Sequence, residues 1–248
     1  AILRFAGFTL LSLANNHVLD YGHEGLLDTV AALDQAGIAH AGAGRSHDEA
    51  HAPAVVTVHG LRIALLAYVN VPDDVGSGFS TRAGAAGPGT PGVAWGTAEA
   101  VRRDVTAARA QAELVIVSVH AGFEYTATPN AVQRELAHAA VEAGAALVLG
   151  SHPHVLQGVE FYRGVPIVYS LGNFVFDLDD DDLRQPGLPS VLSAVLRVTL
   201  DRSGVRALRF LPVRIDERDG RPVPVRGSEA QPVLERLYRL SAALEEGG

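Results

Sequence analysis

The chain has 248 residues, of which 48% are hydrophobic and 19% are charged, and its formal net charge is −8. This composition indicates one large globular domain, spanning residues 1–248, with a substantial buried core. The acidic balance argues against nucleic acid or an anionic membrane as the main partner, although a bound cation can still allow an anionic substrate. Cysteine is absent, which excludes disulfides and thiolate metal sites. No apolar stretch approaches the ~20 residues that span a bilayer, and no targeting signal is visible.

Apolar periodicity predicts an α/β protein in which strands and helices alternate at first and strands dominate later. The predicted strands cover residues 8–13, 54–58, 62–68, 114–119, 146–149, 159–162, 165–169, 191–200 and 205–213. The predicted helices cover residues 24–36, 98–112 and 234–244, and a further helix begins with Thr128 as N-cap and Pro129 at its first position.

Two segments between these elements are predicted to be loops. Glycines and prolines recur over residues 70–96, which predicts a long loop and a candidate lid. Asp177 and the run from Asp179 to Asp182 form an acidic segment without the regular ligand spacing of a calcium loop, so we expect a solvated loop there.

Polar side chains that can bind metals follow three of the predicted strands. Asn16 and His17 come after the first, His120 ends another, and His152 and His154 follow a third. Ligands collect at the carboxyl ends of strands in open α/β sheets, so parallel strands would bring these side chains into one cleft. Imidazole and amide oxygen suit Zn, Mn and Fe ions.

For each single histidine, a structural or surface role competes with metal binding. A lone histidine at a strand end is more often a hydrogen-bonded surface residue, and only the coincidence at three strand ends favours a metal site. The remaining histidines are interpreted as structural or solvent-facing. They are His23, His40, His47, His51, His59 and His138.

Five segments, in this order and spacing, resemble the motifs of the bacterial capsule and poly-γ-glutamate synthesis CapA family. They are residues 13–22 (LANNHVLDYG), 41–44 (AGAG), 119–125 (VHAGFEY), 150–158 (GSHPHVLQG) and 169–174 (YSLGNF). The similarity covers residues 7–177. It implies a calcineurin-like metallophosphoesterase fold, in which two mixed β-sheets flanked by helices form a four-layer α/β/β/α sandwich.

The resemblance also assigns roles to individual residues. Asn16, His120, His152 and His154 match metal ligands, and His17 matches the histidine that assists the leaving group. Residues of the capsule-family motif variants are expected to orient ligands or position the substrate. They are Asp20, Glu124 and Asn173.

The chain departs from the family pattern at its beginning, where the first strand and the first carboxylate-bearing motifs are expected but not found. About half of a two-metal site then remains. Because its expected ligands are neutral, we expect divalent ions to bind weakly and this chain alone to have little or no activity.

The resemblance implies a metal-dependent phosphoesterase that uses two ions of the Mn, Zn or Fe type in its complete site. The substrate would be a phosphoester or an anionic polymer, and other capsule-synthesis proteins would be partners. The expected location is the cell envelope, outside the cytoplasm. The alternative is a non-catalytic envelope protein that binds the polymer or assembles its synthase. Fold and motif do not choose between these functions.

Overall fold

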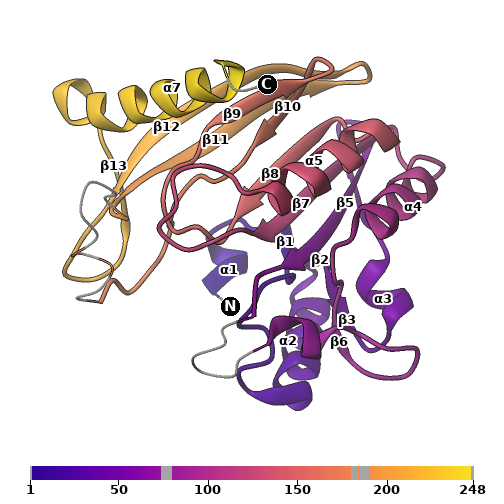
Figure 1. Ribbon diagram of the computed structural model, residues 1–248. Coiled ribbons are helices and arrows are strands. Elements are labelled where there is room, and N and C mark those ends of the chain that lie inside the picture. The colour runs from indigo at the N-terminus through magenta and orange to yellow at the C-terminus, as the bar shows by residue number, and fades with distance from the viewer. Residues whose placement is uncertain (1, 74–79, 180–181, 183, 185–189, 247–248) are drawn as a thin grey trace.

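A six-stranded mixed sheet forms the centre of the computed structural model, which describes residues 2–73, 80–179, 182, 184 and 190–246 (Figure 1). In spatial order its strands are β4 (Ala54–Val58), β5 (Leu61–Asn70), β7 (Leu114–Ala121), β8 (Leu147–Ser151), β10 (Val165–Val168) and β9 (Val159–Tyr162). The four central strands are parallel, and the two edge strands are antiparallel to their neighbours. The parallel strands therefore direct their carboxyl ends to one edge.

Strand β5 shows why both faces of this sheet are covered. Side chains alternate along a strand, and every residue from Ile63 to Val69 is buried. Leu66 and Tyr68 pack with helices α4 (Ala98–Ala108) and α5 (Ala131–Ala143). Leu65 and Val69 pack on the other face with helix α2 (Gly22–Ala36). Two small two-stranded sheets supply the rest of this second layer. They are the parallel pair β1 (Leu10–Ser12) with β2 (Ala39–Ala41) and the antiparallel pair β3 (Ala43–Gly44) with β6 (Gly92–Val93).

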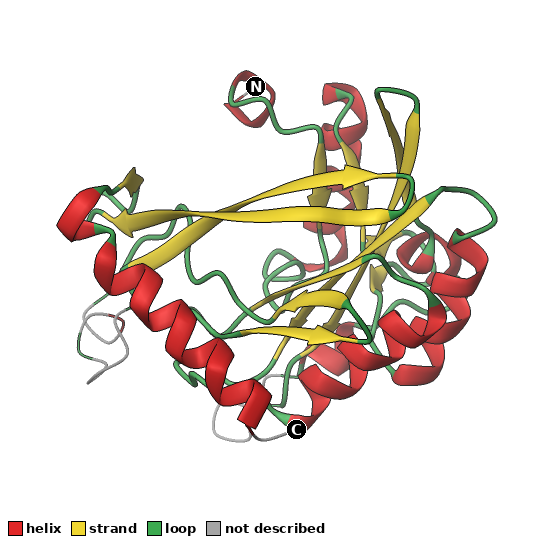
Figure 2. Cartoon of the chain, turned by 90° about the horizontal axis from the view of Figure 1, so that it is seen from above, coloured by secondary structure: helices red, strands yellow, loops and turns green. Residues whose placement is uncertain are grey.

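A second large sheet consists of the long strands β11 (Leu192–Asp201) and β12 (Gly204–Ile215) with the short β13 (Pro222–Pro224). Figure 2 shows the two long strands running side by side. Helix α7 (Gln231–Glu246) begins near one end of this pair of strands. Leu196, Leu208 and Phe210 pack against the β9–β10 end of the central sheet, together with Leu237 of α7. Apolar contacts thus join the two sheets into one body.

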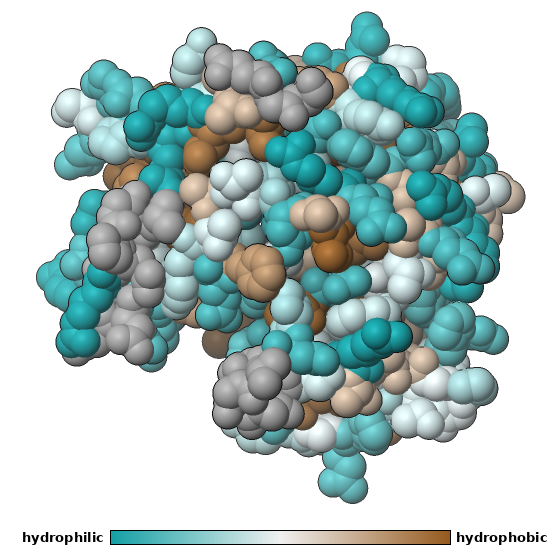
Figure 3. All heavy atoms as spheres, viewed as in Figure 1, coloured by the Kyte–Doolittle hydropathy of each residue, from teal (hydrophilic) through white to brown (hydrophobic). Residues whose placement is uncertain are grey.

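The short elements are α1 (Ile2–Phe5), α3 (His47–His51) and the 3₁₀ turns η1 (Thr81–Gly84) and η2 (Gly227–Glu229). Most of the surface visible in Figure 3 is hydrophilic, and the hydrophobic residues there form small scattered groups. Over the described part of the chain, no helix has the length and apolar character needed to cross a bilayer.

The predicted α/β fold with two sheets and flanking helices is confirmed. In detail, the described pairs of the second sheet are antiparallel rather than mixed. The predicted start of α5 was wrong. Asn130, not Thr128, is the N-cap, because its side chain accepts from the Gln133 N–H while the Gln133 side chain accepts from the Asn130 N–H.

The two loop predictions also need correction. Within residues 70–96, the segment from residue 80 onward is ordered by η1 and by β6, which pairs with β3, while residues 74–79 lie outside the described part. In the acidic segment, Asp180 and Asp181 also lie outside the residues that the structure describes. Asp182 is buried, not solvated, and its side chain accepts hydrogen bonds from the Asp179 N–H and the Tyr125 hydroxyl.

Candidate metal centre

His120 lies at the carboxyl end of β7, opposite Ser151 of β8 in the parallel register. Its Nε2 lies 2.8 Å from Oδ1 of Asn16, which follows β1 in the chain, and its Nδ1 lies 2.9 Å from Oγ of Ser151. Two ligand atoms bound to one ion at bond lengths of ~2.1 Å are about 3 Å apart. The spacing between Asn16 and His120 therefore fits two ligands of the same ion.

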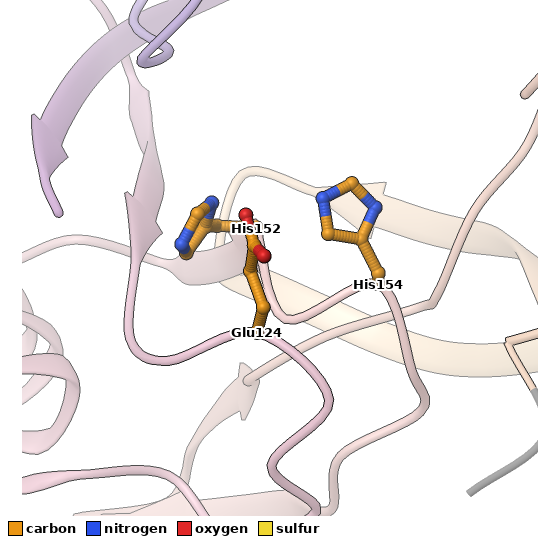
Figure 4. A group of neighbouring side chains, drawn as sticks. All are labelled: Glu124, His152 and His154. Atoms are coloured by element: carbon orange, nitrogen blue, oxygen red, sulfur yellow. The ribbon is translucent and has the colours of Figure 1, made fainter. Parts of the chain in front are cut away.

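His152, His154 and Glu124 form a second group at this edge (Figure 4). One ligand atom from each lies within 4.8 Å of the others. The ring centroids of His120 and His152 are 4.9 Å apart, and those of His152 and His154 are 6.0 Å apart. The four predicted ligands thus lie in one continuous row, with a carboxylate beside its second half.

The backbone around these side chains is unusual. His152 has φ 100°, His154 φ 60° and Tyr125 φ 55°, all in the left-handed region that non-glycine residues seldom adopt. The Tyr125 N–H donates to the Pro153 carbonyl over 2.8 Å, which ties the loop after β7 to the loop after β8. Each such residue costs of order 1–3 kcal/mol, and conformations of this kind cluster at functional sites.

The other expected site residues lie beside the row. The Nδ1 of His154 lies 2.8 Å from Oδ1 of Asn173, so the Nδ1–H donates there and Nε2 stays available to a ligand. His17 Nδ1 lies 3.0 Å from Oδ2 of Asp20. The His17 side chain is 68% exposed, and that of Asp20 is 46% exposed. Asp20 therefore fixes the proton on Nδ1 and leaves Nε2 of His17 directed to other partners.

Burial keeps the central histidines neutral. It lowers the pKa of His120 to about 3, with smaller contributions from the neighbouring His152, His154 and His17. It also lowers the pKa of His152 to about 4, assisted by His154 and His17. The Nδ1 atom of His152 is buried and has no hydrogen-bond partner within the described part of the chain, which is costly unless something binds it.

Close packing holds the two ligand loops in place. A Cβ added at Gly150 would lie 2.0 Å from the Tyr169 carbonyl oxygen, so only glycine allows β8 to approach that segment. The buried Gln133 side chain donates to Oε1 of Gln157 over 2.9 Å, and Gln157 in turn donates to the Thr126 carbonyl over 2.8 Å. This network links the start of α5 to both loops.

Sequence reasoning missed several of these supporting residues. Ser151 belongs to the GSHPH segment, directly before His152. Because successive side chains of a strand point to opposite faces, its position could have indicated a contact with the end of the neighbouring strand. Gln157 belongs to a quoted motif, but nothing local predicts that Gln133 is its partner. The pairing of Tyr125 with Asp182 spans 57 residues and leaves no sequence signal.

A protein-family model described as "Bacterial capsule synthesis protein PGA_cap" matches residues 1–178, which is well over half of the chain. The chain belongs to this family. Its five motif segments all lie within the matched range, as do Asn16, His17, His120, His152 and His154. The PGA_cap match therefore covers the whole row of candidate ligands, whereas the second sheet lies beyond it.

Curated relatives agree with the PGA_cap assignment. The chain is 35% identical to the PGA biosynthesis protein CapA of Bacillus subtilis over 239 residues, covering 96% of this chain and 59% of the relative. It is 35% identical to the capsule biosynthesis protein CapA of Bacillus anthracis, covering 88% and 50%. It is 34% identical to an accessory protein of polyglutamine synthesis from Mycobacterium tuberculosis, covering 82% and 55%. The chain spans between 50% and 59% of these relatives' length.

A solved structure shares the fold. A protein described as a 5′-nucleotidase from Staphylococcus aureus superposes with a TM-score of 0.50 at 14% sequence identity, covering 96% of this chain and 43% of that one. This similarity supports the expected α/β arrangement of sheets and flanking helices in this PGA_cap chain, and at such low identity it concerns the fold alone.

Proposed function

We propose that this chain is the phosphoesterase-like part of a metal-dependent protein of capsule and poly-γ-glutamate synthesis. The observation that carries the proposal is the row from Asn16 through His120 and His152 to His154, with the Glu124 carboxylate beside it. We propose the cell envelope as its location, because relatives are named for capsule biosynthesis.

The donor set fits a divalent ion of the Mn, Zn or Fe type. His152 presents a buried Nδ1 that has no hydrogen-bond partner among the described residues, and its low pKa keeps the ring neutral near neutral pH, so that one ring nitrogen can offer its lone pair to an ion. His120 would bind through Nε2 after its proton shifts to Nδ1, where Ser151 Oγ can accept a hydrogen bond. We propose Asn16 and His120 as ligands at one end of the row and Glu124, His152 and His154 at the other.

Two ions in the complete site would supply a water of lowered pKa and positive charge for the oxygens of an in-line displacement at phosphorus. His17 in its imidazolium form would donate the Nε2 proton to the leaving oxygen and become neutral, while Asp20 accepts from its retained Nδ1–H. Asn173 would keep His154 in the tautomer that presents Nε2. The substrate class is a phosphomonoester or phosphodiester.

The test is hydrolysis of bis-p-nitrophenyl phosphate with added Mn²⁺, measured on residues 1–248 and on a longer natural form of the protein. The chain of residues 1–248 should turn over slowly, because mostly neutral donors hold two ions weakly. A form as long as the curated relatives should turn over orders of magnitude faster if it supplies further carboxylate ligands. His17→Ala in the longer form should remove most of that gain, and the matched control His23→Ala should leave it intact. Equal rates in all variants would refute the assignment.

A second function is favoured by the relative described as an accessory protein of polyglutamine synthesis. In this alternative the same site binds the anionic polymer or assembles its synthase without hydrolysis. No turnover of any phosphoester tried, together with Mn²⁺-dependent binding of poly-γ-glutamate by the wild type but not by His152→Ala, would establish it.

A further inference from the structure

A second histidine pair lies on the short helix α3, away from the row described above. His47 and His51 are four residues apart, so their side chains share one face of the helix. Their rings are stacked, with centroids 4.3 Å apart and planes inclined by 22°. Helix α3 contacts β3 and β6, whereas the row lies at the ends of β7 and β8. The pair is therefore a separate feature of the molecule.

Each ring lies beside a carboxylate through its Nδ1, but only the His51 contact is buried. His51 Nδ1 lies 2.7 Å from Oδ2 of Asp104, and both side chains are more than nine-tenths buried. His47 Nδ1 lies 3.2 Å from Oδ1 of Asp48. A carboxylate that accepts from one ring nitrogen leaves the other nitrogen with its lone pair, as is common around metal-binding histidines. Among the described residues neither Nε2 atom has a hydrogen-bond partner.

Asp104 is itself held firmly as an anion. Burial alone would raise its pKa, but hydrogen bonds from His51 and Arg103 lower that pKa below its ordinary range. The buried Tyr68 hydroxyl also donates to Asp104 over 3.1 Å. The orientation of His51 thus rests on a network joining α3, β5 and α4.

The two rings line a cavity of about 290 Å³, which Trp95, Glu99 and Arg103 also line. The Arg103 guanidinium is engaged with Asp104 over 2.8 Å. Its positive charge offsets that of Asp104, which leaves the carboxylates of Glu99 and Asp48 near the pair, and the local charge favours a cation over an anion.

We propose that His47 and His51 form a binding site for a transition-metal ion of the Cu²⁺, Ni²⁺ or Zn²⁺ type, independent of the row at β7 and β8. The ion is held through the two Nε2 atoms, with water filling its remaining positions in the cavity. Imidazole is a preferred ligand of these ions. In the stacked arrangement the two Nε2 lone pairs run nearly parallel, so binding requires the partly exposed His47 ring to turn away from the exposed Asp48 until its Nε2 converges with that of His51. The orientation of His51 stays fixed by Asp104.

The experiment uses the 248-residue chain with the proposed catalytic row disabled by Glu124→Gln and His152→Ala. Titration with Cu²⁺, followed by calorimetry and electron paramagnetic resonance, should find one remaining equivalent with hyperfine coupling to two imidazole nitrogens. Adding His47→Ala should weaken binding at least tenfold and reduce the coupling to one nitrogen. The matched control His23→Ala, an exposed histidine on α2, should change neither.

Three results would overturn the proposal. They are the absence of a remaining equivalent, binding that His47→Ala leaves unchanged, and equal loss with His23→Ala. His47 is partly exposed, so the substitution should preserve the fold, and an unchanged circular dichroism spectrum and melting temperature check this. The outcome does not depend on the row, so failure here leaves the proposed function untouched.

Discussion

Acidification from pH 7 to pH 5 should lower the free energy of unfolding by about 4 kcal/mol through His120 and His152 alone. Burial lowers their pKa values in the folded protein to about 3 and about 4, while an unfolded chain restores the ordinary value of about 6.5. Below pH 6.5 the unfolded state therefore binds protons that the folded state does not. Stability falls as protons bind preferentially to the unfolded chain.

The magnitude follows from the size of these shifts. At pH 5 each unfolded histidine is almost fully protonated, and each folded one is almost fully neutral. One pH unit of such a difference is worth ~1.36 kcal/mol, so the drop from 6.5 to 5 costs about 2 kcal/mol per histidine. The loss continues down to about pH 4 for His152 and about pH 3 for His120, where the folded protein also takes up protons. Above about pH 7.5 neither group contributes an appreciable slope, because the unfolded histidines are then almost fully neutral as well.

The assay is urea unfolding at pH 7 and pH 5, without metal, for the wild type and three variants. His120→Gln and His152→Gln should each reduce the pH-dependent loss by about 2 kcal/mol, whatever their own stability at pH 7. His23→Gln, which removes an exposed histidine, should keep the full loss. If all four proteins lose the same stability between the two pH values, the buried neutral histidines are not its cause.

Three further predictions concern the same edge of the sheet. Mn²⁺ titration should show weak binding that His152→Ala abolishes and His23→Ala does not, and calorimetry decides this. Gly150→Ala should cost several kcal/mol in urea unfolding, because its Cβ would meet the Tyr169 carbonyl oxygen at 2.0 Å and backbone must move. In the longer natural form, His17→Ala should lower phosphodiester turnover about a hundredfold or more while leaving Mn²⁺ affinity unchanged, since it removes proton donation rather than a ligand.

The main elements of the fold could be predicted because their signals are local. The β-branched run that begins at Leu114 predicts a buried strand, and β7 extends over Leu114–Ala121. Gly37 predicts the end of α2 and has the expected left-handed conformation, with φ 65°. Strand β6 could not be found in this way, because two residues form a strand only where β3 offers a distant partner. Its pairing is a property of tertiary structure.

The candidate site was predictable where it depends on strand ends and unpredictable where it depends on loop conformation. Parallel pairing of β7 with β8 brings His120 next to the HPH segment, as their order in the chain suggests. The position of Glu124 depends instead on the positive φ of Tyr125 and on its hydrogen bond to Pro153. Neither is encoded by a periodicity, so the sequence alone places Glu124 only near the ligands.

The position of Glu124 changes the electrostatic balance of the site. The ligands expected from the sequence are asparagine and histidine side chains, which are neutral and leave the +2 charge of a divalent ion uncompensated. For this reason the sequence alone predicts weak binding. One carboxylate near His152 and His154 reduces that charge to about +1, which the negative charge of a phosphodiester would then neutralise. Two opposite unit charges about 4 Å apart near a protein surface attract by ~4 kcal/mol before desolvation. Ion and anionic ligand should therefore strengthen each other's binding, and this coupling reconciles an acidic protein with the phosphodiester substrate that we propose.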